Sequence, residues 1–366
     1  MTYAVASNGF TEGPAQALRD FLVSRGAEVV TIFHPLTPEQ GTRHVITTYA
    51  SGKRVEERTI PLPLRPPLSF ALDPFVPLLL PRVDVWFGFN PLACARGLLP
   101  RKVRFVALWS VDFVPDRFGR GTLATRVYDR LDRFCCERAD ARIELSEAAR
   151  EARNRRHGLP PDGAHIVPMG AWIDRVPTTT PEAFRRRRVV YLGHLVERQG
   201  VGTLLDALAQ TDGLTADIIG TGPLEAELRA TAVRLGLERR IEFRGFVEDH
   251  REVERLLARC SLAVAPYKQT KDTFTRFADP GKLKAYLAAG LPIVLTDVPP
   301  NARELAREAG AELVEDGARA LADALSRSLA SSDEWERRRE AALGYARRFD
   351  WNVLLGDLLA KLGLTP

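Results

Sequence analysis

Short apolar runs alternate along the chain with stretches of helical periodicity. The runs read as strands buried on both faces and comprise Tyr3–Ala6, Ala27–Phe33, Val83–Phe87, Phe105–Trp109, Ala141–Leu145, Val189–Leu192, Ala216–Ile219 and Ser261–Pro266. The stretches between them predict helices and include Ala15–Arg25, Leu123–Arg138, a helix from the N-cap Ser146 to Arg156, and Leu224–Leu235. Buried strands that alternate with helices predict an α/β fold built on parallel sheets.

Two segments interrupt this alternation. Within His34–Arg82, prolines recur at 61, 63, 66, 67, 74, 77 and 81, which excludes long helices there. Asp174–Arg188 combines two prolines with an arginine run over 185–188, and it predicts a linker whose solvated arginines lead into the next strand. Contact of this arginine run with phosphate or with a membrane is the alternative.

The stretch from Asp279 to Thr296 combines a loop, a helix, a tight turn and a buried strand. Pro280 and Gly281 lie where the helix begins, so the backbone N–H groups there lack partners within the helix. Lys282 follows in the first turn, where a cation is unfavourable unless an anion binds beside it. The stretch therefore predicts an anion site at the helix start, and an ordinary α/β unit with a solvated lysine is the alternative.

Length and net charge limit the number of domains and the kinds of partner that the protein can have. The 366 residues predict about two domains. Residues 1–175 contain 24 Lys and Arg against 19 Asp and Glu, so the whole net charge of +5 lies in the first half. Attraction to a membrane surface is one explanation and an arginine-rich surface without a partner is the other, whereas no basic stripe with interleaved aromatics favours nucleic acid.

Three further features concern the compartment. The four cysteines show no metal-ligand spacing, the first residues do not form a signal-peptide pattern, and no run of about 18 apolar residues predicts a membrane span. Together they favour the reducing cytoplasm, with the inner face of the membrane as an open alternative.

Polar and glycine-containing loops follow several of the predicted strands. The glycine loops are Ser7–Pro14, Gly193–Val201 and Gly220–Pro223. Asp112 follows Phe105–Trp109 in the same way. Because ligands of Rossmann-like folds gather at the carboxyl ends of parallel strands, these loops are candidate binding elements, although Asp112 could equally cap its own loop.

Taken as a series, these segments resemble family 4 glycosyltransferases, in the variant that runs Asp-Pro-x-Lys-Leu-x-Glu-Tyr-Leu-Ala-Ala-Gly-x-Pro-Val-Val. The match is carried by Asp279, Pro280, Lys282, Leu283, Tyr286, Leu287, Ala288, Ala289, Gly290 and Pro292. The resemblance covers nearly all of Val189–Leu362 and is fainter in the first half. It implies a GT-B fold, in which two Rossmann-like domains face each other across a cleft. The implied domains are residues 1–176 on the acceptor side, residues 177–345 on the donor side, and a C-terminal helix within 346–366 that packs back on the first domain.

The resemblance also implies roles for individual residues. Lys282, Arg198 and Asp112 are the expected catalytic residues, the first two as cations on a leaving diphosphate and Asp112 beside the acceptor. Glu12 is expected to contact the acceptor together with Asp112. Donor-binding residues are expected at Gly9, Gly13, Gly193, His194, Gln199, Gly222, Phe246, Val247, Lys268, Asp279, Pro280, Gly281 and Glu304. For Asp279 and Glu304, ordinary roles at a helix N-terminus are the alternative.

The chain departs from the family pattern at four positions. The family carries two glutamates separated by seven residues, where this chain has Phe277 and Ala285. In the family an Arg and a Lys hold the diphosphate, and those positions are His194 and Gln199 here. Arg198 lies next to the second of them and is expected to supply the missing cation, because a guanidinium matches phosphate geometry.

The implied activity is that of an enzyme, a glycosyltransferase that moves a sugar from a nucleoside-diphosphate sugar to a hydroxyl acceptor in a glycan or glycolipid. Retention of the anomeric configuration and catalysis without a bound metal or other cofactor are further expectations. Two alternatives stay open: the same fold modifies a small secondary metabolite, or it binds sugar nucleotides without catalysis. The sequence leaves the nucleobase, the sugar and the acceptor undetermined.

Overall fold

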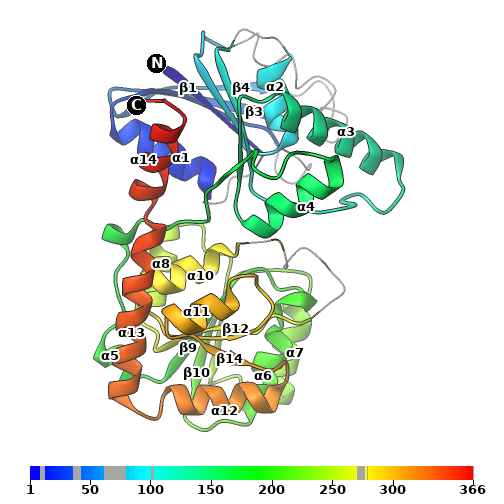
Figure 1. The fold of residues 1–366 in the computed structure, drawn as a ribbon. Coiled ribbons are helices and arrows are strands. Elements are labelled where there is room, and N and C mark those ends of the chain that lie inside the picture. Colours follow the sequence, from blue (N-terminus) through cyan, green and yellow to red (C-terminus); the bar gives the residue numbers. More distant parts are fainter. Residues whose placement is uncertain are drawn as a thin grey trace. The chain divides into compact units, whose positions relative to one another are not determined.

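The computed structural model describes residues 1–8, 13–35, 43–61, 80–99, 103–269, 277 and 279–365. The chain divides into two compact units (Figure 1): the first combines Met1–Pro168 with Trp351–Pro366, and the second is Met169–Asp350. From the sequence, these two divisions were expected at nearby positions, after residues 176 and 345. The chain therefore leaves the first unit once and later returns to it.

The first unit is built on one sheet with the strand order β4-β3-β2-β1-β5-β6-β7-β8. Its strands are β1 (Thr2–Ser7), β2 (Glu28–Phe33), β3 (Arg43–Ala50), β4 (Lys53–Pro61), β5 (Val85–Gly88), β6 (Phe105–Ser110), β7 (Ala141–Glu144) and β8 (His165–Ile166). The pairs that join β2, β1, β5, β6, β7 and β8 are all parallel. The strands predicted from apolar runs in this unit are present, because those runs are buried on both faces of the sheet.

An antiparallel hairpin, β3–β4, extends the sheet beyond β2. It lies within His34–Arg82, just before the run of prolines that begins at Pro61, and it was not predicted. β3 carries the β-branched residues of the sequence Arg-His-Val-Ile-Thr-Thr-Tyr-Ala, which suit a strand. β4 is charged and exposed along almost its whole length, as is common in an edge strand that must not pair with another chain.

Five helices of the described chain belong to the first unit: α1 (Pro14–Ser24), α2 (Pro91–Leu98), α3 (Leu123–Arg138), α4 (Glu147–His157) and α14 (Trp351–Lys361). The Ser146 hydroxyl accepts from the Ala149 N–H at 3.1 Å, so the predicted cap of α4 is confirmed. α14 packs against α1, and the Tyr3 hydroxyl donates to the Thr365 carbonyl at 2.8 Å. The prediction that the last helix returns to the first domain is confirmed.

The second unit has a fully parallel sheet with the order β11-β10-β9-β12-β13-β14. Its strands are β9 (Arg188–Leu192), β10 (Thr215–Ile219), β11 (Ile241–Gly245), β12 (Leu262–Ala265), β13 (Ile293–Thr296) and β14 (Glu312–Val314). Helices cover both faces, so the strands are apolar on both sides. The helices are α5 (Pro181–Arg185), α6 (Val201–Ala209), α7 (Glu225–Arg234), α8 (His250–Ala258), α10 (Gly281–Ala288), α11 (Ala302–Glu308), α12 (Ala318–Ser328) and α13 (Ser332–Ala346), with short 3-10 turns η4 (Ile173–Arg175), η5 (Glu197–Gln199) and η6 (Arg347–Phe349).

The predicted linker Asp174–Arg188 belongs to the second unit and contains α5. Arg188 is the first residue of β9, and its Nε lies 2.5 Å from Oδ2 of the buried Asp217. The expectation that the whole arginine run is a solvated lead-in was therefore wrong for Arg188, because a carboxylate on the next strand holds it against the sheet.

The loops at the carboxyl ends of β9, β10 and β12 pack closely against one another. Gly200 has φ of +70°, and a Cβ there would lie 1.7 Å from the Pro266 carbonyl oxygen. A Cβ at Gly220 would lie 2.0 Å from the Gly193 carbonyl oxygen. Only glycine fits at these two positions, so the glycines set the spacing of the loops around the candidate site.

Candidate active site

The sheet of the second unit has a switch point at β9. From β9 the chain moves outward through β10 and β11, and it then continues on the other side of β9 with β12, β13 and β14. In open parallel sheets, the loops on the two sides of such a point diverge and leave room for a ligand at the carboxyl ends of the strands. The candidate site lies there, beside the ends of β9 and β12.

Lys282, in the first turn of α10, reaches this switch point. Its Nζ donates to Gln199 Oε1 at 2.5 Å and lies 4.4 Å from the ring centroid of Tyr191 and 4.7 Å from that of Tyr267. A Cβ at Gly193 would come within 3.1 Å of this Nζ, so the glycine leaves space for the ammonium. The ammonium therefore contacts the loop after β9 and the first residues after β12.

No carboxylate among the described residues balances the charge of Lys282. Burial lowers the pKa of its ammonium from 10.5 to about 7. In the part of the chain that the structure describes, its partners are an amide oxygen and two aromatic faces, and no carboxylate pairs with it. A buried cation without a counter-charge is costly, so the arrangement favours an anionic ligand at this point.

The start of α10 adds hydrogen-bond donors to this cation. Pro280 is the N-cap, it offers no side-chain cap, and the first turn contains no acidic residue. Among the described residues, the N–H groups of Gly281 and Lys282 have no partner, so they and the positive end of the helix dipole are available to an anion. The anion site itself stays a prediction.

Asp279 does not cap this helix, and that alternative was wrong. Its Oδ2 accepts from the Met169 N–H at 2.7 Å, and its Oδ1 accepts from Lys284 Nζ at 2.8 Å. Lys284 is buried and needs this carboxylate as its counter-charge. The assignment of Asp279 as a sugar contact stays a prediction.

The loop after β9 arranges the other polar groups near Lys282. The Tyr191 hydroxyl donates to the His194 carbonyl at 3.1 Å, and His194 Nδ1 donates to the Thr221 carbonyl at 2.7 Å while the rest of the ring is exposed. Gln199 accepts from Lys282 through its Oε1. The lysine of the family pattern is thus absent at 199, but a lysine from α10 brings its ammonium to the same loop.

Arg198 and Lys268 lie at the same edge of the sheet. The Lys268 N–H donates to the Arg198 carbonyl at 3.0 Å, which ties the loop after β12 to the loop after β9. Lys268 Nζ forms an ion pair with Glu197. Both residues therefore belong to the neighbourhood of Lys282, and Lys268 already has a carboxylate partner.

The remaining donor-side residues follow neighbouring strands. A Cβ at Gly222 would lie 2.4 Å from the Leu195 carbonyl oxygen, so the loop after β10 also rests on the loop after β9. Phe246 and Val247 follow β11, and Phe246 is 63% exposed, which is unusual for a large apolar side chain. Glu304, in the first turn of α11, accepts from the Tyr345 hydroxyl at 2.7 Å. The roles of these four residues in donor binding stay predictions.

The two positions that lack the family's glutamates are both at least partly described by the structure. Ala285 lies in α10 and packs against the apolar core of the unit, and Phe277 is partly buried.

In the first unit the strand order has its switch point between β1 and β5. Asn8 follows β1 and Asn90 follows β5, and Asn90 Nδ2 donates to Asn8 Oδ1 at 2.5 Å. Both asparagines were missed as candidates, although each lies within three residues of the end of a predicted strand. Gly13 is the N-cap of α1, whereas Gly9 and Glu12 lie outside the described residues.

Asp112 lies just beyond the end of β6, as predicted. Its Oδ2 accepts from Arg117 Nη2 at 2.5 Å, and its side chain is 29% exposed. Its carbonyl oxygen accepts from Arg153 at 3.2 Å. The carboxylate is thus held in place and partly accessible, which is compatible with the predicted contact to an acceptor hydroxyl.

A buried ionic network around Arg153 supports this loop and was not predicted. The Arg153 guanidinium lies 2.5 Å from Asp132 Oδ1 and 3.1 Å from Glu144 Oε1, and His157 Nε2 lies 2.9 Å from Asp132 Oδ2. Burial acts to raise the pKa of Asp132, but Arg153 and His157 outweigh it and the pKa lies below its usual value. Burial raises the pKa of Glu144 despite the same arginine.

Two further observations concern metal and membrane. The described residues contain no group of three or more His, Cys, Asp or Glu side chains placed to hold a metal ion. None of the helices in the described ranges is long and apolar enough to cross a bilayer.

Solved structures identify the class of fold. HepE from Anabaena, in complex with UDP-glucose, matches with a TM-score of 0.73 at 17% identity and covers 99% of both chains. Sucrose-phosphate synthase from Thermosynechococcus elongatus matches with a TM-score of 0.74 at 18% identity, over 99% of this chain and 98% of the synthase. The fold is that of the GT-B glycosyltransferases, and the predicted fold class is confirmed.

Sequence comparisons identify a family in addition to a fold, and the family match lies within the second unit. Residues 186–331 match the family described as "Glycosyl transferases group 1". A GDP-mannose-dependent alpha-(1-6)-phosphatidylinositol dimannoside mannosyltransferase from Mycobacterium tuberculosis is 32% identical over 179 residues, which is 48% of this chain and 43% of the relative. The chain thus matches less than half the length of that relative. The resemblance to glycosyltransferases is confirmed over this part of the chain.

Proposed function

We propose that the chain is a glycosyltransferase that moves a sugar from a nucleoside-diphosphate sugar to a hydroxyl acceptor in a glycan or glycolipid. The observation that carries the proposal is the Lys282 ammonium, which is buried at the switch point beside the open start of α10 and has no carboxylate partner among the described residues. The match to glycosyltransferases covers the same part of the chain.

The proposed chemistry places the donor diphosphate beside Lys282 and the first turn of α10. When the bond between the anomeric carbon and the diphosphate oxygen breaks, negative charge develops on the leaving oxygen. A protonated Lys282, the N–H groups of the helix start and the Arg198 guanidinium stabilise that charge, so the reaction needs no bound metal. Asp112 orients the acceptor hydroxyl.

The donor can be identified by calorimetric titration with UDP-glucose, GDP-mannose and dTDP-glucose. UDP-glucose is bound in the HepE complex, and the mycobacterial relative is named as GDP-mannose-dependent, so both are tested first. Saturable binding of one donor, followed by transfer to an acceptor, supports the proposal. Binding without transfer to any acceptor would favour the non-catalytic alternative suggested by His194, Gln199, Phe277 and Ala285.

The acceptor class needs a separate comparison. The name of the mycobacterial relative describes a phosphatidylinositol-linked acceptor, which makes a lipid-linked acceptor in the cytoplasm, at the inner face of a membrane, the first choice. Transfer is measured with a lipid-linked glycan, a soluble oligosaccharide and a panel of small hydroxylated metabolites. Transfer confined to the last panel would replace the glycan or glycolipid proposal by the tailoring alternative.

Donor binding is expected to depend on pH through Lys282. Its pKa of about 7 in the empty site means that the amine is mostly neutral at pH 8, whereas the diphosphate, a diester, remains ionised. Binding at pH 8 should therefore take up close to one proton, and affinity should be constant below pH 7 and fall by up to about tenfold per pH unit above it. Calorimetry at pH 8 in two buffers of different ionisation enthalpy measures this uptake; a value near zero would contradict it.

Arg198→Ala is expected to weaken donor binding by about tenfold, because one charge-assisted contact to phosphate is lost. The control is Arg229→Ala, an exposed arginine on α7 that pairs with Glu225 on its own helix. Full transfer activity in Arg198→Ala would mean that His194 carries the role or that the site works with Lys282 alone.

Retention of the anomeric configuration is the expected stereochemical outcome. In a retaining transfer the acceptor attacks on the face that the diphosphate leaves, so the groups that hold the diphosphate also define the reacting face. Proton NMR of the product formed from an α-linked donor gives the anomeric coupling. A β-linked product would mean inversion, and would assign Asp112 as a general base.

A further inference from the structure

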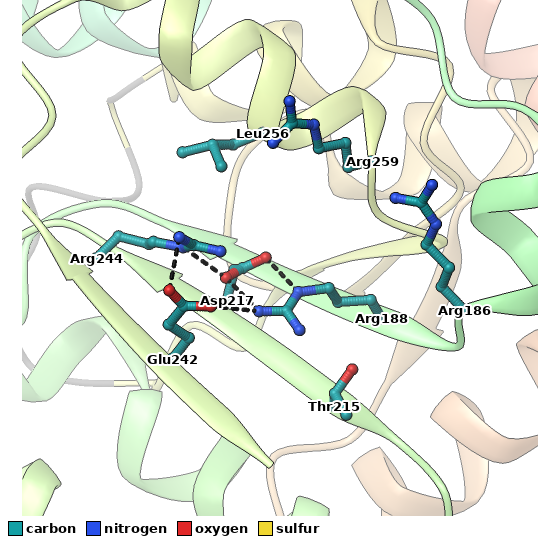
Figure 2. Close-up of a pocket in the computed structure, with 8 residues that line it drawn as sticks. All are labelled: Arg186, Arg188, Thr215, Asp217, Glu242, Arg244, Leu256 and Arg259. Atoms are coloured by element: carbon teal, nitrogen blue, oxygen red, sulfur yellow. Dashed lines mark hydrogen bonds and ion pairs between the residues drawn. The ribbon is translucent and has the colours of Figure 1, made fainter. Parts of the chain in front are cut away.

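The second unit contains a cavity of about 450 Å³ that lies apart from the Lys282 site. Arg186, Arg188, Thr215, Asp217, Glu242, Arg244, Leu256 and Arg259 line it (Figure 2). Its residues from β9 and β10 lie at the beginning and middle of those strands, and Glu242 and Arg244 come from β11, whereas Lys282 contacts the loops that follow β9 and β12. The cavity also uses the end of α8, which covers the same face of the sheet.

The floor of the cavity is a closed set of ion pairs. Arg188 and Arg244 converge on Asp217 from two sides (Figure 2), at 2.5 and 2.9 Å. Both also pair with Glu242, at 3.0 and 2.6 Å. Asp217 is buried, yet its pKa lies below the usual value because the two arginines outweigh the effect of burial. Two guanidiniums thus balance two carboxylates, and the floor carries no net charge.

The rim carries two more arginines, Arg186 and Arg259. In the described part of the chain, neither side chain donates a hydrogen bond or forms an ion pair, and Figure 2 draws no dashed line to either. Arg186 acts electrostatically on the fully exposed Glu182 but does not pair with it. Each arginine follows the C-terminus of a helix, α5 or α8, where the helix dipole favours a cation. The lining of the cavity therefore carries a net charge of +2. This charge comes from Arg186 and Arg259, whose guanidinium N–H groups have no partner among the described residues.

We propose that this cavity binds a phosphate-bearing ligand at a site separate from the donor site. Guanidiniums bind phosphate oxygens with paired, charge-assisted hydrogen bonds, and the neutral floor keeps the opposing carboxylates occupied. The volume accommodates a phosphate together with the small group that carries it. The ligand is either a free phosphorylated metabolite or the phosphate of an anionic lipid headgroup, and the proposal concerns the chemistry that these two share.

The test compares the double variant Arg186→Gln/Arg259→Gln with the control Arg185→Gln/Arg251→Gln. The control removes the same charge from exposed positions on α5 and α8 that do not line the cavity. Pyrophosphate is the soluble probe, titrated by calorimetry, and phosphatidylglycerol vesicles are the lipid probe, measured by co-sedimentation against phosphatidylcholine vesicles. We expect at least about tenfold weaker binding of one probe in the cavity variant and no change in the control.

A Lys282→Met background separates the cavity from the donor site, because pyrophosphate binding at the cavity should persist there. Loss confined to the pyrophosphate titration identifies a soluble ligand, and loss confined to the vesicles identifies a lipid headgroup. The proposal is overturned if the wild type binds neither probe, if the control loses as much as the cavity variant, or if Lys282→Met abolishes all binding. Sugar transfer to a soluble acceptor should be unchanged in the cavity variant. The experiment therefore tests the cavity proposal independently of the proposed function.

Discussion

Replacement of Lys282 by methionine is expected to lower the rate of sugar transfer by about 10²–10³-fold and at the same time to stabilise the empty protein. The first effect follows because the substitution removes the cation that faces the charge developing on the diphosphate. The second follows because the ammonium is buried without a carboxylate partner among the described residues, so methionine of similar length fills the space without that cost. Steady-state kinetics and thermal unfolding of the same preparation measure both effects.

The stabilisation by Lys282→Met should itself depend on pH. The unfolded lysine binds a proton up to its usual pKa of 10.5, whereas the folded one loses it above about 7. Between these values the unfolded state binds more protons, so the empty wild-type protein gains stability as pH rises, and the advantage of methionine is largest below pH 7.

Lys284→Met is the matched control, two residues further along the same helix. Lys284 is more deeply buried but pairs with Asp279 at 2.8 Å, so its replacement leaves a buried carboxylate with fewer partners and should destabilise the protein. Opposite effects of the two substitutions on the melting temperature would distinguish an unpaired functional lysine from a structural one. Unchanged transfer in Lys282→Met would remove the residue from the site.

Replacement of Arg153 by methionine is expected to destabilise the first unit by about 3–5 kcal/mol. Arg153 is 1% exposed, and its loss would leave Asp132 and Glu144 buried without their shared cation. Because Arg153 also donates to the Asp112 carbonyl, the loop that carries the predicted acceptor contact should loosen as well. Urea unfolding followed by circular dichroism measures the stability change.

The control for this substitution is Arg156→Met, one turn further along α4. Arg156 pairs with Asp116 and Asp129, but its side chain is 32% exposed, so its loss should cost no more than about 1 kcal/mol. Equal effects of the two variants would contradict the central role of the buried network.

Local patterns were sufficient to predict the elements that position Lys282. The helix start at Pro280–Gly281 and the glycine loops after β9 and β10 are encoded within a few consecutive residues, and each element is buried where its apolar pattern indicates. The sequence could not predict the partners of the polar groups, since these lie far apart along the chain: Asp279 binds the Met169 N–H 110 positions away, and Lys282 meets Gln199 83 positions away. A helix cap was the alternative role for Asp279, but its carboxylate instead binds Lys284, five residues along the chain, and the distant Met169 N–H.

The buried network of Arg153 and the β3–β4 hairpin were missed for related reasons. Arg153 lies on a helix with a largely polar sequence, where an arginine is ordinarily solvated. It is buried because the fold packs it against Asp132 and Glu144, which lie on other elements. The hairpin ends where the run of prolines begins, and the charged residues of β4 conceal its strand pattern. β3 is stabilised by pairing with β2, and β4 by pairing with β3.

The return of α14 to the first unit has a consequence for the order of folding during synthesis. The first 168 residues leave the ribosome before any part of the second unit, yet their unit still lacks the helix that packs on α1 and the Thr365 carbonyl that receives the Tyr3 hydroxyl. The second unit is a continuous stretch and has all its residues available as soon as Asp350 has emerged. Of the two units, the one whose synthesis begins earlier is therefore completed later, and α1 is not covered by α14 until the whole second unit has been made.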